Sequence, residues 1–134
     1  RPTFALHGGA AIELDSSLGT SSLLRGSTGA ASLWGVIGMY GGSIRHMSVV
    51  AAHAVETGHT RLEGVTTEGC GTNTSAWPGG RVTLANCTLG APTGPVSHTA
   101  AEGGYISDTG STGVRTASPA ANTVGNHNAY IRVA

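Results

Sequence analysis

A near-regular internal repeat constrains the fold of this chain more than any other feature. The segments LRGST, IRHMS, LEGVT, LANCT and ISDTG align in one register, and each begins with leucine or isoleucine. The successive spacings between these anchors are 20, 18, 22 and 22 residues. The anchors are Leu24, Ile44, Leu62, Leu84 and Ile106. Because a unit of this length cannot bury a hydrophobic face alone, the repeat predicts that neighbouring units stack on one another.

The residue two positions after each anchor indicates a bend. These residues are Gly26, His46, Gly64, Asn86 and Asp108. Glycine, asparagine, aspartate and histidine tolerate the positive φ of a sharp corner. We therefore expect each unit to be a strand, a corner and a second strand. Surface turns of an antiparallel β-sandwich or barrel are the alternative interpretation.

Composition favours strands over helices. Glycine provides 22 of the 134 residues, and neither lysine nor glutamine occurs. Glycine, serine, threonine, valine and asparagine, which are frequent here, are poor helix formers. The predicted fold is all-β: a short right-handed parallel β-solenoid of about five coils. We expect this solenoid over residues 1–110 and an extended, irregular C-terminal tail over residues 111–134, which caps the solenoid or contacts another subunit.

The segment VTLANCTL, residues 82–89, resembles the rungs of right-handed parallel β-helix proteins. Pectate-lyase-like enzymes and bacteriophage tailspikes share that fold. The resemblance covers roughly residues 22–110 and concerns the fold, which does not by itself define a function. It implies that the five anchors stack as an inward aliphatic ladder.

Charge composition argues against two classes of partner. The formal net charge is zero, and only 10% of the residues are charged. Such a chain lacks the basic surface typical of proteins that bind nucleic acid or anionic membranes. No apolar run approaches the roughly 18–20 residues that span a bilayer. We therefore expect neither a nucleic-acid nor a membrane partner.

The histidines and cysteines do not indicate a metal or cofactor site. His53, Glu56 and His59 lie close in sequence, but strand alternation places Glu56 on the face opposite the two histidines. HExxH and CxxC spacings are absent. The sequence leaves open whether Cys70 and Cys87 form a disulfide.

Scarce carboxylates provide only one weak catalytic alternative. Glycan hydrolysis requires two carboxyl groups roughly 5 to 10 Å apart. The repeat places Glu63 and Asp108 two strand spacings apart, or about 9.6 Å. Trp77, in the turn AWPGG, could supply an exposed aromatic surface for binding a sugar.

These observations favour a non-catalytic structural or surface-binding protein. The concrete form that we expect is a virion component, either a capsid-decorating protein or part of a tail fibre or spike. Open coil ends and a polar tail predict a homo-oligomer, with a trimer as the specific expectation and a capsid or tail as the larger assembly that would contain it. The expected location is a virion or the extracellular space. The alternative is a carbohydrate-active β-helix enzyme or a glycan-binding module.

Overall fold

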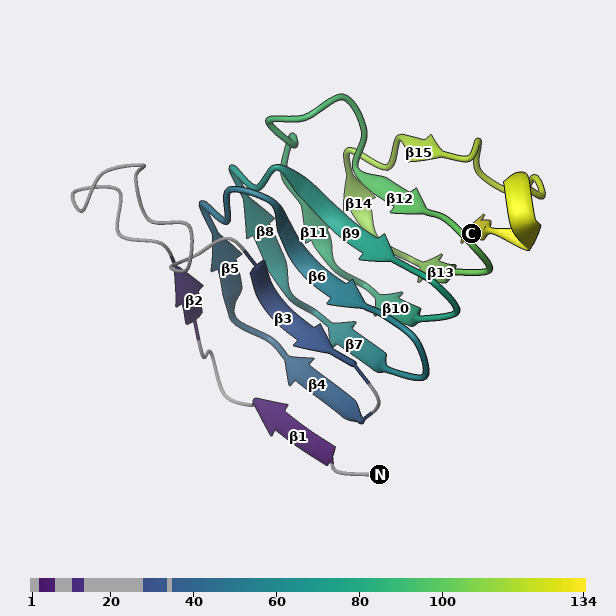
Figure 1. The fold of residues 1–134 in the computed structure, drawn as a ribbon. Helices are drawn as coiled ribbons and strands as arrows, with labels where there is room; N and C mark the ends of the chain where they lie inside the picture. Colours follow the sequence, from purple (N-terminus) through teal and green to yellow (C-terminus); the bar gives the residue numbers. More distant parts are fainter. Residues whose placement is uncertain (1–2, 7–10, 14–27, 34) are drawn as a thin grey trace.

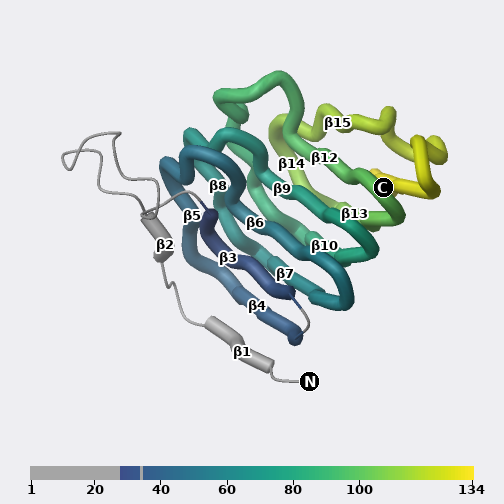
Figure 2. The backbone as a smooth tube through the Cα atoms, in the orientation of Figure 1, coloured from purple at the N-terminus to yellow at the C-terminus, as the bar shows by residue number. Residues whose placement is uncertain are grey.

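Each coil of the chain contributes one strand to each of three parallel sheets. The structure is a computed structural model, and it describes residues 3–6, 11–13, 28–33 and 35–134. The strands wind into a β-solenoid of about five coils, followed by one additional strand (Figure 1). The tube in Figure 2 shows successive coils lying side by side along the solenoid axis. No helix in the described part of the chain is long and apolar enough to cross a membrane.

The three sheets have regular strand orders. Sheet A contains β1 (Thr3–Leu6), β4 (Val36–Tyr40), β7 (His59–Glu63), β10 (Arg81–Ala85), β13 (Tyr105–Thr109) and β16 (Tyr130–Val133). Sheet B contains β2 (Ala11–Glu13), β5 (Ser43–Arg45), β8 (Thr66–Glu68), β11 (Thr88–Leu89) and β14 (Thr112–Gly113). Sheet C contains β3 (Thr28–Ser32), β6 (Val50–Ala54), β9 (Thr72–Ala76), β12 (His98–Ala100) and β15 (Ala117–Ser118). Every pairing within these sheets is parallel, which confirms the solenoid and rejects the antiparallel alternative.

The corner between sheets A and B explains the asparagine in LANCT. Asn86 has φ of 52°, and its backbone N–H donates to the carbonyl of Thr109 on the next coil. Gly64 occupies the same corner on the preceding coil, so both predictions are confirmed. The prediction for Asp108 was wrong, because Gly110, with φ of 70°, turns this corner instead. Gly26 lies outside the described residues.

The predicted aliphatic ladder is correct for two anchors and displaced for two others. Leu62 and Leu84 are register partners, as expected. Ile106 pairs with Val82 rather than with Leu84, a shift of two residues that keeps its side chain on the inner face. Ile44 lies in sheet B, where it pairs with Thr67. Leu24 lies outside the described residues.

The displacement of Ile44 has a simple physical origin. One coil contains more than one corner, and two of these corners have similar local sequences. His46, with φ of 56°, turns the chain after β5 of sheet B, where Gly69 turns the next coil. IRHMS therefore matches LANCT because both contain a strand followed by a positive-φ residue. The two segments occupy different corners.

The interior of the solenoid is filled by alternating strand positions from all three sheets. Leu62, Leu84 and Ile106 from sheet A are almost fully buried, and Ile44 and Leu89 from sheet B join them. Alanines dominate the inward positions of sheet C. Small side chains there let sheet C pack close to sheet A.

Residues after Gly110 contribute strands to all three sheets and also cover one strand edge. β14, β15 and β16 extend sheets B, C and A, respectively, and a 3-10 turn (Asn126–Asn128) precedes β16. Asn122 lies along β16: its backbone N–H donates to the carbonyl of Ile131 at 2.7 Å. Its side-chain amide donates to the carbonyl of Val133 and accepts from the N–H of the same residue. The last strand of sheet A therefore has hydrogen-bond partners on its outer edge.

Candidate functional site

The structure does not bring the predicted carboxylate pair together. Asp108 points into the solenoid and is fully buried. Glu63 lies on the outer face of sheet A, where it forms an exposed ion pair with Arg61 at 3.2 Å. Register pairs Glu63 with Ala85, and Ala85 with Thr109, so the two carboxyl groups lie on opposite faces of one sheet. This geometry does not fit a pair of glycosidase carboxylates on either side of a sugar.

Asp108 belongs to a polar network that crosses the core at the last complete coil. The Nε2 atom of His98, on β12, lies 3.2 Å from Oδ2 of Asp108. Nδ1 of the same ring lies 2.7 Å from the hydroxyl of Thr74 on β9. Arg115 donates from Nε to Oδ2 of Asp108 at 2.7 Å and from a terminal nitrogen to the backbone carbonyl of Asp108. The network links sheet A to sheet C.

Opposing effects set the ionisation of Asp108. Burial alone would raise the pKa of the carboxyl group, because it removes water from the charged form. Hydrogen bonds with His98 and Arg115 favour that charged form and outweigh burial, so the pKa lies below its ordinary value. Asp108 is therefore a carboxylate at neutral pH.

The network contains a hydroxyl, an imidazole and a carboxylate in sequence, a combination able to transfer protons. A neutral His98 would donate from Nε2 to Asp108 and accept at Nδ1 from the hydroxyl of Thr74. The side chains of all three residues have no exposed surface, so a substrate has no route to the hydroxyl in this conformation. The geometry fits a polar cross-link that holds the last coil together.

The histidines outside the core bind protein partners of their own. Nδ1 of His53 lies 3.1 Å from the carbonyl of Ser75, and Nε2 of His59 lies 2.8 Å from the hydroxyl of Thr83. Glu56 occupies a corner with φ of 53°. The described residues contain no group of three or more His, Cys, Asp or Glu side chains arranged to hold a metal ion.

Both cysteines are free thiols inside the solenoid. Cys70 and Cys87 are buried and are not bonded to each other. Burial raises the pKa of each thiol, despite hydrogen bonds with nearby backbone that act in the opposite direction. A raised pKa leaves little thiolate at neutral pH, so neither residue has the character of an activated nucleophile.

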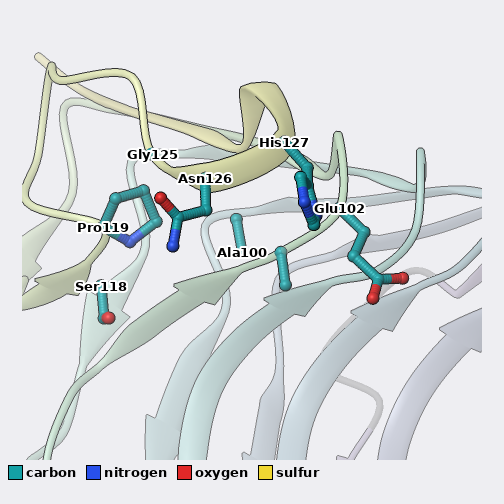
Figure 3. A pocket seen from close by; sticks show the side chains of 8 residues that line it. Ala100, Glu102, Ser118, Pro119, Gly125, Asn126 and His127 are labelled. Atoms are coloured by element: carbon teal, nitrogen blue, oxygen red, sulfur yellow. The ribbon is translucent and has the colours of Figure 1, made fainter.

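Two of the clefts lined by described residues lie near the ends of strands. A cleft of about 510 Å³ lies beside the C-terminal segment. It is lined by Ala100, Ala101, Glu102, Ser118, Pro119, Gly125, Asn126 and His127. Figure 3 shows the Asn126 side chain near Pro119, with the Glu102 carboxylate directed away from them. The polar groups of this cleft therefore do not converge on a single point.

The second cleft, of about 340 Å³, lies where β7 and β10 begin. It is lined by Glu56, Thr57, Gly58, His59, Gly79 and Arg81. Trp77, the predicted aromatic contact, is 45% exposed near the same corner, and its backbone carbonyl accepts from the N–H of Glu56. Trp77 is thus accessible, as a binding role would require.

The outer face of sheet A carries a group of large polar and aromatic side chains. We call this surface the arginine–tyrosine face, and it includes all three tyrosines of the chain. Its members are Tyr40, His59, Arg61, Glu63, Arg81, Tyr105, Tyr130 and Arg132. The guanidinium of Arg61 lies 5.9 Å from the ring centre of Tyr40, and that of Arg81 lies 5.4 Å from the ring centre of Tyr105. These cation–π contacts hold the long arginine side chains along the sheet.

The internal repeat does not by itself predict this face. Its signal was present in the sequence, since the arginines and tyrosines alternate with inward aliphatic residues in RVTL, YISD and YIRV. Identifying it required the correct alignment of Ile106 with Val82, which places Arg81, Tyr105 and Tyr130 in one row. Comparisons with known protein families, with curated proteins and with solved structures gave no match.

Proposed function

We propose that this protein is a non-catalytic structural or surface-binding solenoid. One observation carries the proposal: polar groups suited to proton transfer are buried in the core, whereas exposed arginines and half-buried tyrosines gather on one sheet face. A flat, laterally extended surface suits contact with another macromolecule, whereas a small-molecule enzyme uses a concave site.

The specific form that we propose is a virion component, either a capsid-decorating protein or part of a tail fibre or spike. Support comes from the parallel solenoid and from its tailspike-like rungs, which is a fold-level analogy. In this role the chain would form a homo-oligomer, with a trimer as the specific form, attached to a capsid or tail and located on a virion or outside the cell.

Fractionation of native particles tests this form. Density-gradient separation of lysates from the source, followed by mass spectrometry, should find the protein in particle fractions together with other particle proteins. Light scattering on the purified chain should report a mass above that of one 13.3 kDa chain. A protein that remains monomeric at micromolar concentration and appears only in particle-free fractions would contradict the virion proposal.

A glycan-binding role is the second candidate, and the arginine–tyrosine face favours it. Aromatic rings and guanidinium groups provide apolar contact and directional hydrogen bonds for sugars. The carbohydrate-active enzyme in this class has weaker support, because Glu63 and Asp108 lie on opposite faces of sheet A. An assay for newly formed reducing ends separates the two forms: a binding protein leaves a glycan intact, whereas a hydrolase shortens it.

A further inference from the structure

We infer that the arginine–tyrosine face binds an acidic polysaccharide, a glycan that carries a carboxylate on successive sugar units. This inference rests on the surface-binding function proposed above and assigns a ligand class to it. Three of the seven arginines in the chain lie on this face, although the whole chain is neutral. Glu63 is the one carboxylate among the described residues of the face, and it already pairs with Arg61. The face is therefore a local site of positive charge that complements an anion.

The positions of the arginines favour a linear ligand. Arg61 on β7 and Arg132 on β16 lie in the same row of sheet A, separated by Thr83 and Ser107. Three strand spacings of about 4.8 Å place their backbones about 14 Å apart along the solenoid axis. Arg81 lies on a strand between them, in the neighbouring row. A polymer with repeated charges can contact all three guanidinium groups, whereas a single small anion contacts only one.

Two of these arginines have no carboxylate partner in the described part of the chain. Among the described residues, neither Arg81 nor Arg132 forms a salt bridge. Arg81 packs on Tyr105, and Arg132 makes one long hydrogen bond, 3.5 Å, to the hydroxyl of Thr109. Both residues are exposed. Their guanidinium groups retain donors for a carboxylate, which guanidinium binds in a two-pronged geometry.

The arrangement of the tyrosines distinguishes a glycan from a nucleic acid. Single-stranded nucleic acids stack their bases on exposed aromatic faces. Here the rings of Tyr105 and Tyr130 lie nearly parallel, 8° apart, with their centres separated by 6.0 Å. Arg81 covers Tyr105 from β10, on the side opposite β16. Because neighbours occupy both faces of the Tyr105 ring, that ring leaves no face on which a base could stack, and the exposed guanidinium groups remain the main contacts for a ligand.

The cleft beside this face supports the same assignment. His59 and Arg81 line the cleft of about 340 Å³ where β7 and β10 begin. Glu56 also lines it, so a carboxylate of the ligand would bind at Arg81 while sugar hydroxyls contact Glu56. The cleft therefore adds a concave region, next to Arg81, to the arginine–tyrosine face.

Binding of uronic acid octamers tests the inference. The full chain is titrated by isothermal calorimetry with alginate octamers and, separately, with the same octamers after reduction of their carboxyl groups to alcohols. We expect measurable binding to the acidic octamer alone, weakened by added salt. Arg81→Ala and Arg132→Ala should each weaken binding about tenfold or more, the loss of one charged contact. Arg45→Ala is the matched control, because Arg45 lies in sheet B and pairs with Glu68, and this variant should bind unchanged.

Three results would overturn the inference: no binding of the acidic octamer, equal binding of its reduced form, or unchanged affinity of the folded Arg81→Ala variant. Tighter binding of a thymidine 20-mer than of the octamer would also overturn it in favour of nucleic acid. Circular dichroism confirms that each variant is folded. The broader surface-binding proposal fails by a different result, namely shortening of the octamer by the protein, which the reducing-end assay detects.

Discussion

Leu84 and Asp108 occupy the same register position on adjacent strands of sheet A. A carboxylate therefore continues a row of core side chains that includes Met39, Leu62 and Leu84. An unpaired charge at this depth would cost several kcal/mol. The chain compensates for it with Arg115 and His98, both from the C-terminal half of the molecule. At this register position the last coil thus has a buried ionic contact where the preceding coils have aliphatic side chains.

Replacement of Asp108 tests this role. Asp108→Asn keeps the size of the side chain but removes its charge, leaving the Arg115 guanidinium without its carboxylate partner and weakening the contact with His98. We expect the free energy of unfolding to fall by about 3 kcal/mol or more, because one partner of a buried ion pair is lost. Urea denaturation at pH 7 measures the change. Glu63→Gln is the control: it removes an exposed carboxylate and should change stability by about 0.5 kcal/mol or less. Equal effects of the two substitutions would contradict a buried ionic cross-link.

Acid should weaken the same cross-link. The pKa of Asp108 is lower in the folded protein than in the unfolded chain, where an aspartate titrates at about 3.9. Its contribution to stability is therefore complete above that value and is lost as the pH falls through the folded pKa. We expect the stability difference between the natural protein and Asp108→Asn to be constant near about pH 5.5 and to shrink below about pH 4. Urea midpoints measured across this range provide the difference. Parallel curves for the two proteins would show that the folded pKa is not lowered.

The fold was predictable because every coil repeats the same local sequence pattern. Inward aliphatic residues and positive-φ residues recur at a near-constant spacing, and LEGVT and LANCT alone identify adjacent coils. The register beyond Leu84 was harder to predict, because the segment between β11 and β12 is longer than in other coils and shifts Ile106 by two positions. A two-residue shift preserves which side chains face inward, so the hydrophobic pattern does not detect it.

The polar core could not be read from the sequence in the same way. His98 and Arg115 lie outside the five aligned segments of the repeat, and the sequence pattern predicts that their partner Asp108 is a corner residue. Only the three-dimensional path brings β12 and the segment after β14 next to β13. Pairings between side chains from different sheets depend on how three corners close each coil, which local patterns do not specify.

The stacked corner of Asn86 and Gly110 provides a test of packing between coils. A Cβ atom added at Gly110 would overlap Oδ1 of Asn86, and the φ of 70° is itself unfavourable for a side chain. We expect Gly110→Ala to cost about 1–2 kcal/mol from conformation alone, with a further loss from the overlap. In an Asn86→Gly background the further loss should disappear, giving a coupling energy of about 0.5 kcal/mol or more.

Gly64 is the matched control for this cycle. It has φ of 63°, but a Cβ atom there would meet nothing closer than the backbone nitrogen of Gly41 at 4.0 Å. Gly64→Ala should therefore show only the conformational cost and should be additive with Asn86→Gly. Coupling as large for Gly64→Ala as for Gly110→Ala would mean that the effect comes from the corner conformation and not from the contact.

The free cysteines should report global opening of the solenoid. Cys70 and Cys87 are buried, and burial raises the pKa of both thiols. A thiol reagent at about pH 8 should react slowly with the native protein and rapidly in guanidinium chloride, where it should titrate both thiols. Asp108→Asn should accelerate the native reaction, because it increases the open population. Rapid labelling of the folded natural protein would contradict the buried positions.

Replacement of Asn122 tests whether this residue protects the outer edge of β16. An uncovered strand edge offers N–H and C=O groups to another chain and promotes association. Asn122→Ala removes both side-chain hydrogen bonds to Val133, so we expect a loss of about 1–2 kcal/mol and faster amide exchange in β16. Hydrogen exchange measures the local effect, and light scattering measures self-association.

Asn126→Ala is the control for this edge. Asn126 lies in the same C-terminal segment, but in the described part of the chain its side chain makes no hydrogen bond. Its substitution should leave exchange in β16 and the molecular mass unchanged. If Asn122→Ala exchanges as slowly as Asn126→Ala, the amide of Asn122 does not protect the edge. If the Asn122→Ala variant is less stable but its molecular mass in solution does not rise, Asn122 stabilises β16 and does not control association. The expected role of the tail in subunit contact must then come from another surface.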